Sequence, residues 1–314
     1  MSVPHKLPKQ QGIALITVLL VLAVVTVVLV SMSSSRQFDI RRTQNQLRSN
    51  QAWEYLHAME AWAKGRLQED FDKNKFDAAK DVWDKPLKPK SIPGGTLEAN
   101  ITELQGRINL NNLLVEGKPS EQDVQRLKRL FVYLDIKPEL IEPILDWMDE
   151  DQEIRYPEGA EDETYTALLP PYRSANRIFA DVNELLKVQG VTVKDVHKLQ
   201  NYIYVAKDYE QLNINTASAV VLRCLADDIS KDKAESIYRA NGKPFDKVDE
   251  FLKDEAMAGI EVNKDTLGVT SKHFLVSGKV EMDNNALVFQ SQLYRDKEGK
   301  VSIITRSRRS PFYE

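Results

Sequence analysis

The uninterrupted apolar run at positions 13–30 constrains this chain more than any other feature of its sequence. Its only polar side chains are Thr17 and Thr26, which can hydrogen-bond to carbonyl oxygens of their own helix. As an α-helix the run would be about 27 Å long, close to the hydrocarbon thickness of a bilayer. The run therefore predicts one transmembrane helix. A cleaved secretory signal is the alternative, because the serines at positions 31–35 resemble a small-residue cleavage site.

The helical pattern continues beyond the apolar run. The chain turns polar from Phe38, and no proline follows until Pro86. Apolar residues then recur at three- and four-residue spacing, which indicates one amphipathic helix over residues 13–67. We expect its first third to lie in lipid and its last third to pack on a folded domain. The face expected to contact partner proteins comprises Ala52, Tyr55, Leu56, Met59, Trp62 and Ala63.

Composition excludes several classes of protein. The chain has 314 residues, with 43 Lys and Arg against 47 Asp and Glu, so its net charge of −4 gives no general attraction to nucleic acid. Cys224 is the single cysteine and there are four histidines, too few for an intrachain disulfide or a Cys/His zinc cage. No Ser, His or Cys constellation is recognisable in the sequence. We therefore expect a protein that is not an enzyme.

Alternation of apolar and polar residues predicts an antiparallel sheet built from both ends of the chain. Residues 96–104 alternate, as do residues 274–282. Residues 287–294 and 301–305 flank the turn Asp296-Lys-Glu-Gly299 and predict a hairpin. The segment from Asp70 to Gly95 is rich in Lys, Asp and Pro and is expected to be a loop. Together with the long helix, this predicts an α+β fold.

A helical insertion is expected between the two parts of the sheet, at residues 111–270. It contains a weak internal repeat: Asn109-Leu-Asn111 matches Asn213-Ile-Asn215, and residues 182–186 match residues 248–252. The first copy is the longer one, and the excess is enough for a helix plus an acidic loop. We interpret the insertion as two helical units of related design.

The acidic loop is the densest chemical signal, because residues 146–163 include nine carboxylates and only Arg155 to offset them. So many like charges repel unless water or a cation neutralises them. Carboxylate oxygens suit calcium, which accepts six to eight oxygen ligands in irregular geometry. The candidate ligands are Asp149, Asp151, Glu161 and Asp162. A solvated loop without an ion is the alternative, and Ile154 stands where an EF-hand would need glycine.

Residues 212–245 have a second interpretation, because two short helices joined by a turn are typical of helix-hairpin-helix DNA-binding units. Such units grip phosphate through backbone amides of a glycine-rich turn. Here the turn reads Ala226-Asp-Asp-Ile-Ser230, whose two carboxylates would repel phosphate. A structural hairpin is the better interpretation, and a membrane-tethered periplasmic protein for DNA binding or uptake is the alternative function.

The motifs together resemble a known family. Residues 9–20, Lys-Gln-Gln-Gly followed by Ile-Ala-Leu-Ile-Thr-Val-Leu-Leu, are similar to a type IV prepilin leader, which prepilin peptidase cuts between glycine and the apolar helix, here Gly12 and Ile13. The rest resembles the large K-type minor pseudopilins of type II secretion, whose features include the motifs at residues 106–112, 170–177 and 212–217. Thr17 replaces the usual fifth-position glutamate, as in that subfamily.

The resemblance implies a pilin-like fold with two inserted SAM-like domains. The implied segments are a leader at 1–12, a helix at 13–67, a loop and first strands at 68–110, the first SAM-like domain at 111–210, the second at 211–270 and the last strands at 271–314. Members of the family bind calcium at the acidic region and carry a methylated amino terminus after cleavage.

The implied function is that of a minor pseudopilin at the tip of the pseudopilus, which initiates its assembly and helps to export folded proteins across the outer membrane. The protein would cross the inner membrane once, with its C-terminal part in the periplasm. Its implied partners are the I-type and J-type minor pseudopilins and prepilin peptidase. Inner-membrane platform proteins and secreted substrates are further partners that the resemblance suggests, and nucleic acid is not among them.

Overall fold

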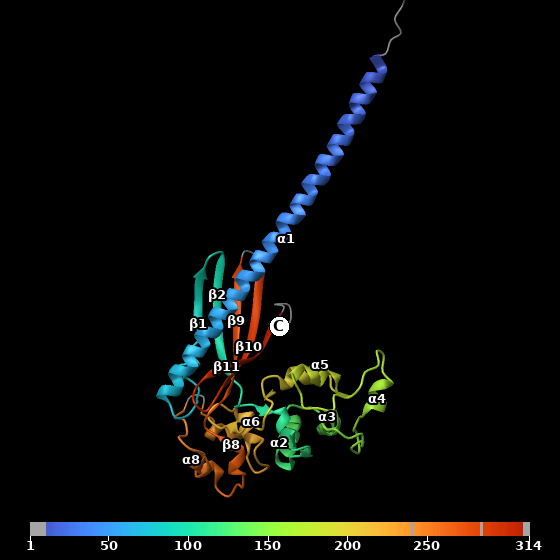
Figure 1. Ribbon diagram of the computed structural model, residues 1–314. Helices are drawn as coiled ribbons and strands as arrows, with labels where there is room; N and C mark the ends of the chain where they lie inside the picture. Colours follow the sequence, from blue (N-terminus) through green and yellow to red (C-terminus); the bar gives the residue numbers. More distant parts are fainter. Residues whose placement is uncertain (1–10, 240–241, 283–284, 310–314) are drawn as a thin grey trace, which may run out of the picture. The chain divides into compact units, whose positions relative to one another are not determined.

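The computed structural model describes residues 11–239, 242–282 and 285–309 (Figure 1). The chain divides into two units, Met1–His57 and Ala58–Glu314. Helix α1, Gln11–Lys73, contributes to both units. The predicted long N-terminal helix is therefore present, and it continues past the expected end at residue 67 as far as Lys73.

The described part of the first unit is entirely helical, and its side chains at positions 13–30 are exposed. Thr17 donates its hydroxyl to the carbonyl oxygen of Ala14 at 2.9 Å, and Thr26 donates to that of Leu22 at 2.6 Å. Both threonines thus satisfy their polarity within the helix, as the sequence predicts. The segment presents an uninterrupted apolar surface and is long enough to serve as a single-pass membrane anchor.

The second unit contains a five-stranded antiparallel sheet in the order β1-β2-β9-β10-β11. Its strands are β1 Leu87–Ile92, β2 Gly95–Glu103, β9 His273–Met282, β10 Asn285–Arg295 and β11 Val301–Arg309. The hairpin of β10 and β11 turns at Asp296, whose N–H donates to the carbonyl of Lys300, and Gly299 adopts a φ of +83° there. The predicted α+β class is confirmed.

Strand β1 corrects the expectation of a loop between Asp70 and Gly95. The segment contains Pro89, which has no N–H to donate to a ladder, and the register of β1 against β2 shifts between Leu87 and Lys90 around it. An edge strand tolerates this irregularity because it pairs on one side. Composition suggested a loop, but pairing with β2 holds the segment extended.

The last turns of α1 pack on one face of the sheet. Ala63 and Leu67 join a buried cluster with Trp83, which precedes β1, and with residues of three strands, namely Ile101, Phe274, Val276 and Leu293. Met59 lies over Gly278, where an added Cβ would come within 1.9 Å of the Met59 sulfur. Glu60 is buried and accepts hydrogen bonds from Ser291 and from Arg306 Nε, each at 2.7 Å. The helix is thereby fixed on the sheet by apolar packing and by charged pairs, Glu60 with Arg306 and Asp70 with Arg295.

The helical insertion leaves the sheet at the end of β2 and returns at the start of β9. These two strands pair with each other, and Glu103 lies opposite Phe274. Its first half comprises β3 Ile108–Asn109, η1 Leu110–Leu113, β4 Leu114–Val115, β5 Lys118–Pro119, α2 Glu121–Tyr133, η2 Pro138–Leu140, α3 Ile141–Met148, α4 Asp162–Thr166, η3 Val182–Lys187, α5 Val193–Leu199 and β6 Ile203–Tyr204.

The second half comprises β7 Leu212–Asn213, α6 Ala219–Arg223, α7 Lys231–Ile237, α8 Val248–Leu252, η4 Glu255–Met257, η5 Lys264–Thr266 and β8 Leu267–Gly268. Both halves share one hydrophobic core. Arg126 of α2 is buried between them, where it pairs with Asp123 and donates to Thr266 of η5. The two halves are thus joined by a common core, and their assignment as SAM-like domains stays a prediction.

The internal repeat seen in the sequence corresponds to a repeated hydrogen-bond pattern. Asn111 donates to the carbonyl of Phe179 and accepts from its N–H, both at 2.9 Å. Asn215 makes the same two bonds with Phe245, at 3.0 and 2.8 Å. Each half of the insertion also contains a short pair of parallel strands, β3 with β6 in the first half and β7 with β8 in the second. In each half, the side chain of one buried asparagine therefore bonds both the N–H and the carbonyl of a phenylalanine that is distant in the chain, as a neighbouring strand would.

Replacing either asparagine should destabilise the insertion. In Asn111→Ala or Asn215→Ala, the N–H and carbonyl of the facing phenylalanine lose their partner, at about 1–3 kcal/mol for each buried group left unsatisfied. Thermal unfolding of the detergent-solubilised chain, followed by circular dichroism, measures the effect. The exposed Asn201→Ala is the control and should change stability by less than about 0.5 kcal/mol. Equal melting temperatures for all three variants would contradict this role.

Candidate functional site

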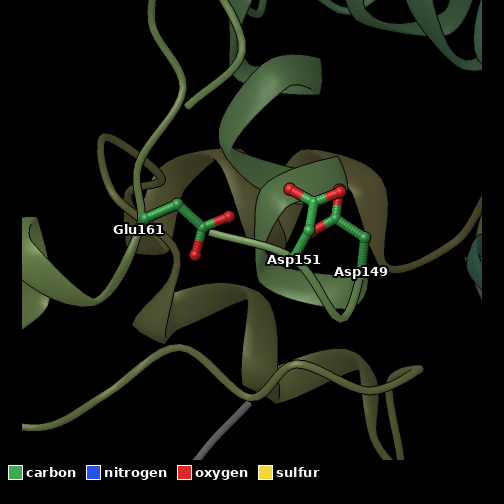
Figure 2. Close-up of side chains that lie close together, drawn as sticks. All are labelled: Asp149, Asp151 and Glu161. Carbon is green, nitrogen blue, oxygen red and sulfur yellow. The ribbon is translucent and has the colours of Figure 1, made fainter. Parts of the chain in front are cut away.

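The acidic loop between α3 and α4 contains the candidate cation site. Asp149 ends α3, Asp151 follows it, and Glu161 precedes α4. One carboxylate oxygen from each of the three lies within 4.8 Å of the others. Figure 2 shows Glu161 directed from the far side of the loop toward the two aspartates. Three hard oxygen ligands on one loop could hold a divalent cation, whose remaining ligands would be water or backbone oxygens.

The electrostatics of this cluster are unfavourable without an added positive charge. Burial, together with the neighbouring carboxylates, raises the pKa of Asp149 to about 6 and that of Glu161 to about 7. Asp149 Oδ1 and Glu161 Oε1 are buried and accept no hydrogen bond from the described residues. Unpartnered buried carboxylate oxygens are costly, and a cation between them would offset that penalty. The residues present therefore fit a cation such as calcium.

The structure places the fourth predicted ligand, Asp162, outside the group of three. Asp162 Oδ1 accepts hydrogen bonds from the N–H and the hydroxyl of Ser174, at 3.0 and 2.8 Å. Its role in this structure is to tie α4 to the segment that follows it. This contact joins two parts of the chain that the spacing of carboxylates in the sequence cannot relate.

Sequence reasoning missed the importance of Asp146 and Arg155. Asp146 is fully buried on α3, and burial raises the pKa of its carboxyl. Arg155 lies with its Nε 3.2 Å from Asp146 and forms a second ion pair with Asp149. The guanidinium therefore neutralises part of the cluster from one side. The signal available in the sequence was that Arg155 is the only basic residue in the acidic stretch.

An aromatic cluster supports the loop and explains the motif at residues 170–177. Trp147 of α3 meets Tyr165 of α4 edge to face at 5.2 Å, and Tyr172 stacks on Tyr165 at 5.4 Å. Asn176 adds a backbone hydrogen bond to Trp147. The motif thus packs against α3 and α4 and fixes the two ends of the acidic loop.

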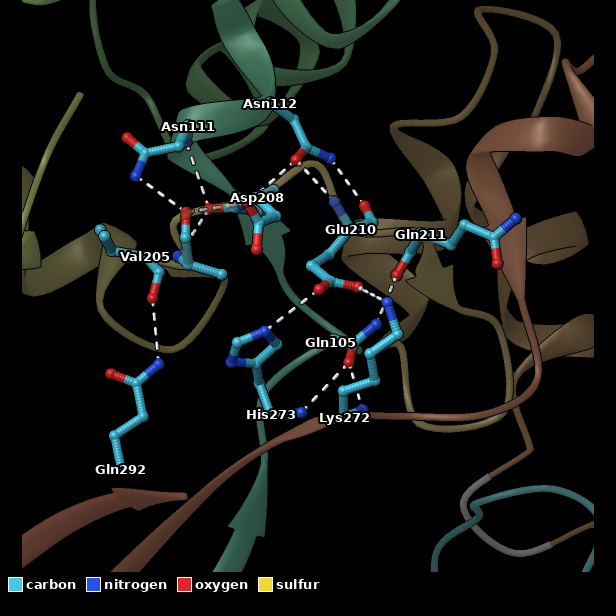
Figure 3. Close-up of polar contacts among 12 residues, drawn as sticks. Gln105, Asn111, Asn112, Val205, Asp208, Glu210, Gln211, Lys272, His273 and Gln292 are labelled. Atoms are coloured by element: carbon cyan, nitrogen blue, oxygen red, sulfur yellow. Dashed lines mark hydrogen bonds and ion pairs between the residues drawn. The ribbon is translucent and has the colours of Figure 1, made fainter. Parts of the chain in front are cut away.

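A second polar cluster, which sequence analysis did not predict, surrounds the linker between the two halves of the insertion, residues 205–211. Figure 3 shows asparagines of the first half on one side of the linker and residues of the sheet on the other. Asn112 bonds both the N–H and the carbonyl of Glu210, at 3.1 and 2.7 Å. Lys272 and His273 contact the Glu210 carboxylate at 2.9 and 3.2 Å. The motif at residues 106–112 therefore serves to hold this linker.

The buried Glu210 carboxylate is charged because its partners compensate for burial. Burial acts to raise its pKa, but hydrogen bonds from His273 and Lys272 outweigh that effect and lower it. Gly106 also has a structural role, since an added Cβ would lie 2.6 Å from the Thr216 backbone. This junction joins both halves of the insertion to the sheet.

The predicted processing site lies at the start of α1. Gly12 and Ile13 are in its first turn, and the side chain of Ile13 is exposed. Cleavage of this peptide bond stays a prediction.

The predicted partner surface on α1 is divided by the structure. Ala52 and Leu56 are buried in the first unit's last turns, while Tyr55 is half-buried. In the second unit, Met59 and Ala63 are buried against this chain's own sheet, while Trp62 is half-buried. Burial within this chain contradicts the prediction that Ala52, Leu56, Met59 and Ala63 contact partners. Met59 and Ala63 instead pack on this chain's own sheet. Tyr55 and Trp62 keep exposed surface.

The rival chemical interpretations find no support in the described residues. Cys224 is buried, and burial raises the pKa of its thiol to about 12, so it is not a nucleophile at neutral pH. The turn between α6 and α7 carries the two carboxylates that oppose phosphate binding. Asp227 in that turn pairs with Arg129 of α2, a contact that joins the two halves of the insertion. The hairpin is thus a packing element.

Comparison with known proteins identifies the family. Family models described as type II secretion system (T2SS), protein K match residues 106–208 and 212–270. Protein K of Pseudomonas aeruginosa is 34% identical, over 95% of this chain and 92% of that protein. The chain belongs to the protein K family of type II secretion. Protein K of Aeromonas hydrophila is 27% identical, over 95% of this chain and 97% of that protein.

The fold has a solved counterpart. A chain in the crystal structure of the GspK-GspI-GspJ complex from enterotoxigenic Escherichia coli matches with a TM-score of 0.77 and 24% identity. The match covers 86% of this chain and 99% of that chain, so the two share a fold. Membership in the protein K family also makes this chain a component of a secretion apparatus, which confirms the prediction that it is not an enzyme.

Proposed function

We propose that this chain is a minor pseudopilin at the tip of the type II secretion pseudopilus, where it initiates assembly and helps to export folded proteins across the outer membrane. The observation that carries the proposal is membership in the protein K family over 95% of the chain. The apolar segment of α1 would anchor it in the inner membrane by a single pass, with the second unit in the periplasm.

Position 17 supports a place at the tip. Pilin-like subunits usually carry a glutamate there, which is thought to meet the charged amino terminus of a neighbouring subunit within the bilayer, where an unpaired charge is costly. Thr17 has no charge and its hydroxyl is already bonded to Ala14. It therefore needs no such neighbour. A subunit that offers no carboxylate for a salt bridge fits one end of the assembly better than its shaft.

The insertion supports the same location. It occupies the chain between Glu103 and His273 and folds around its own core beside the sheet. A mass of this size on every subunit would obstruct close stacking of the next subunit along a shaft. On one terminal subunit it meets no such obstacle.

The partners that we propose are the I-type and J-type minor pseudopilins. Support comes from the solved relative, whose complex contains GspI and GspJ. On the second unit, the exposed part of Trp62 and the adjoining sheet are the contact surface that we propose. Tyr55 of the first unit is proposed as a separate contact. Inner-membrane platform proteins and secreted substrates would meet the assembled complex.

Crosslinking tests the location. A photo-activated residue in place of Trp62 should crosslink to two smaller pilin-like chains in membranes that contain the whole secretion system. The same residue in place of Tyr156, which is 93% exposed on the insertion, is the control and should not yield those products. Regularly spaced self-crosslinks, with this chain as abundant as the major pseudopilin, would rule out the tip.

Processing by prepilin peptidase is part of the same proposal. Cleavage between Gly12 and Ile13 would place a new amino terminus, which the family methylates, directly before the uncharged run at residues 13–30. Intact mass of the membrane-extracted protein should correspond to the loss of residues 1–12 plus one methyl group. A Gly12→Leu variant should keep the leader. A retained Met1 in the wild type, or a cut among residues 31–35, would contradict the assignment.

Calcium binding at Asp149, Asp151 and Glu161 is the third element that we propose. The support is the convergence of three carboxylates with two unpartnered buried oxygens. A bound ion would fix the loop between α3 and α4 and so stabilise the whole insertion, because both halves share one core. Ligand binding to the folded state adds about 2.7 kcal/mol at a hundredfold excess over Kd.

Chelation should therefore lower the melting temperature of the chain, and added calcium should restore it. The double variant Asp149→Asn with Asp151→Asn should lose this response because two of the three ligand charges are gone. Glu153→Gln, at an exposed carboxylate outside the group, is the control and should respond like the wild type. A melting temperature that changes with neither calcium nor chelator would contradict calcium binding and favour a solvated loop without an ion.

A further inference from the structure

The two edges of the sheet differ in a way that packing alone does not require. Strand β1 forms one edge and carries Lys88, Pro89 and Lys90, residue types that discourage further strand pairing. Strand β11 forms the other edge and contains neither proline nor lysine. Among the described residues, no strand pairs with its outer side. Strand β11 therefore keeps a backbone N–H at every residue, whereas β1 lacks one at Pro89.

The β11 edge is regular over its last residues. Ile304 is an extra residue in β11, because Gln292 lies opposite Thr305 while Leu293 lies opposite Ile303. Beyond this bulge, residues 305–309 stay in unbroken register with β10. The outward backbone groups of these residues thus form a straight ladder to which another strand could add.

A groove lies beside this ladder on the sheet face opposite α1. It has a volume of about 890 Å³, and its floor is formed by Leu275, Ser277, Gln290 and Gln292. One wall comes from η3 and α5, where Leu186 and Val193 are 43% and 64% exposed. Thr305 and Ser307 of β11 line the same groove. An added strand would direct alternate side chains toward this space, since side chains alternate between the faces of a sheet.

The charge of β11 indicates what kind of polypeptide segment would pair with its outer side. Residues 301–309 contain three arginines and no acidic residue, but Arg306 already pairs with Glu60 of α1. The positive charge that Glu60 does not offset in this strand is that of positions 308 and 309. Arg107 also lines the groove. Cross-strand pairs of opposite charge stabilise a sheet, whereas like charges directly opposite one another destabilise it. We infer that residues 305–309 of β11 bind an extended acidic segment of another polypeptide, which adds to the sheet as a sixth strand. This inference does not depend on the helix contacts proposed above.

Hydrogen exchange of the full chain in detergent tests the site. The probe is a short peptide in which glutamate alternates with threonine, and the control peptide has lysine in place of glutamate. The glutamate peptide should slow amide exchange within residues 305–309 by about tenfold, because new ladder bonds protect the outward N–H groups. The lysine peptide should not, and exchange in β1 should be unchanged. Protection by neither peptide, or equal protection by both, would overturn the inference.

Charge reversal gives the sharper comparison. Arg308→Glu with Arg309→Glu should abolish protection by the glutamate peptide and create protection by the lysine peptide. The matched control, Lys88→Glu with Lys90→Glu on the opposite edge, should leave the wild-type preference intact. If the reversed variant does not fold, Arg308→Gln with Arg309→Gln should still weaken binding of the glutamate peptide at least about threefold. An unchanged preference in folded variants at β11 would contradict the site.

Discussion

Strands β2 and β9 are far apart in the chain, yet they pair over their whole length, from Gly95 opposite Met282 to Glu103 opposite Phe274. This pairing brings the two ends of the helical insertion together, so the insertion can fold around its own core without interrupting the sheet. It also completes the surface on which Ala63 and Leu67 of α1 are buried. The last turns of α1, the sheet and the insertion therefore depend on one long-range antiparallel contact.

Among the described residues, several buried carboxylates have a basic partner, whereas those of the acidic loop are only partly compensated. Glu60, Asp77 and Glu210 each have a basic partner, namely Arg306, Arg295 and Lys272, and they act as joints between elements. The charge of each of these carboxylates is compensated within the chain, since a basic side chain of opposite charge offsets the cost of burying it. Asp149 pairs with Arg155, but Asp149 and Glu161 each retain a buried oxygen without a partner among the described residues. The acidic loop is the place where an external cation would complete the balance.

The surface of α1 that packs within the chain differs from the surfaces that stay exposed. The stripe of α1 that contains Met59 and Ala63 is used within the chain, and Tyr55 and Trp62 remain at its margins. Strands β1 and β11 are the two edges of the sheet, and among the described residues no strand covers the outer side of either. For a member of a secretion assembly, such a division would leave separate surfaces for the membrane anchor and for the contacts proposed above.

The sequence by itself determined the features that depend on local pattern. The uncharged apolar run at residues 13–30 predicted a helix long enough to cross a membrane, and alternation predicted β2, β9 and the hairpin of β10 and β11. The repeat at Asn109 and Asn213 was visible, but its cause was not. Only the tertiary structure decided that Asn111 and Asn215 bond Phe179 and Phe245, that Pro89 lies in a strand, and that Asp162 lies outside the group of three carboxylates. Each of these depends on contacts between residues distant in the chain, which local periodicity and composition do not encode.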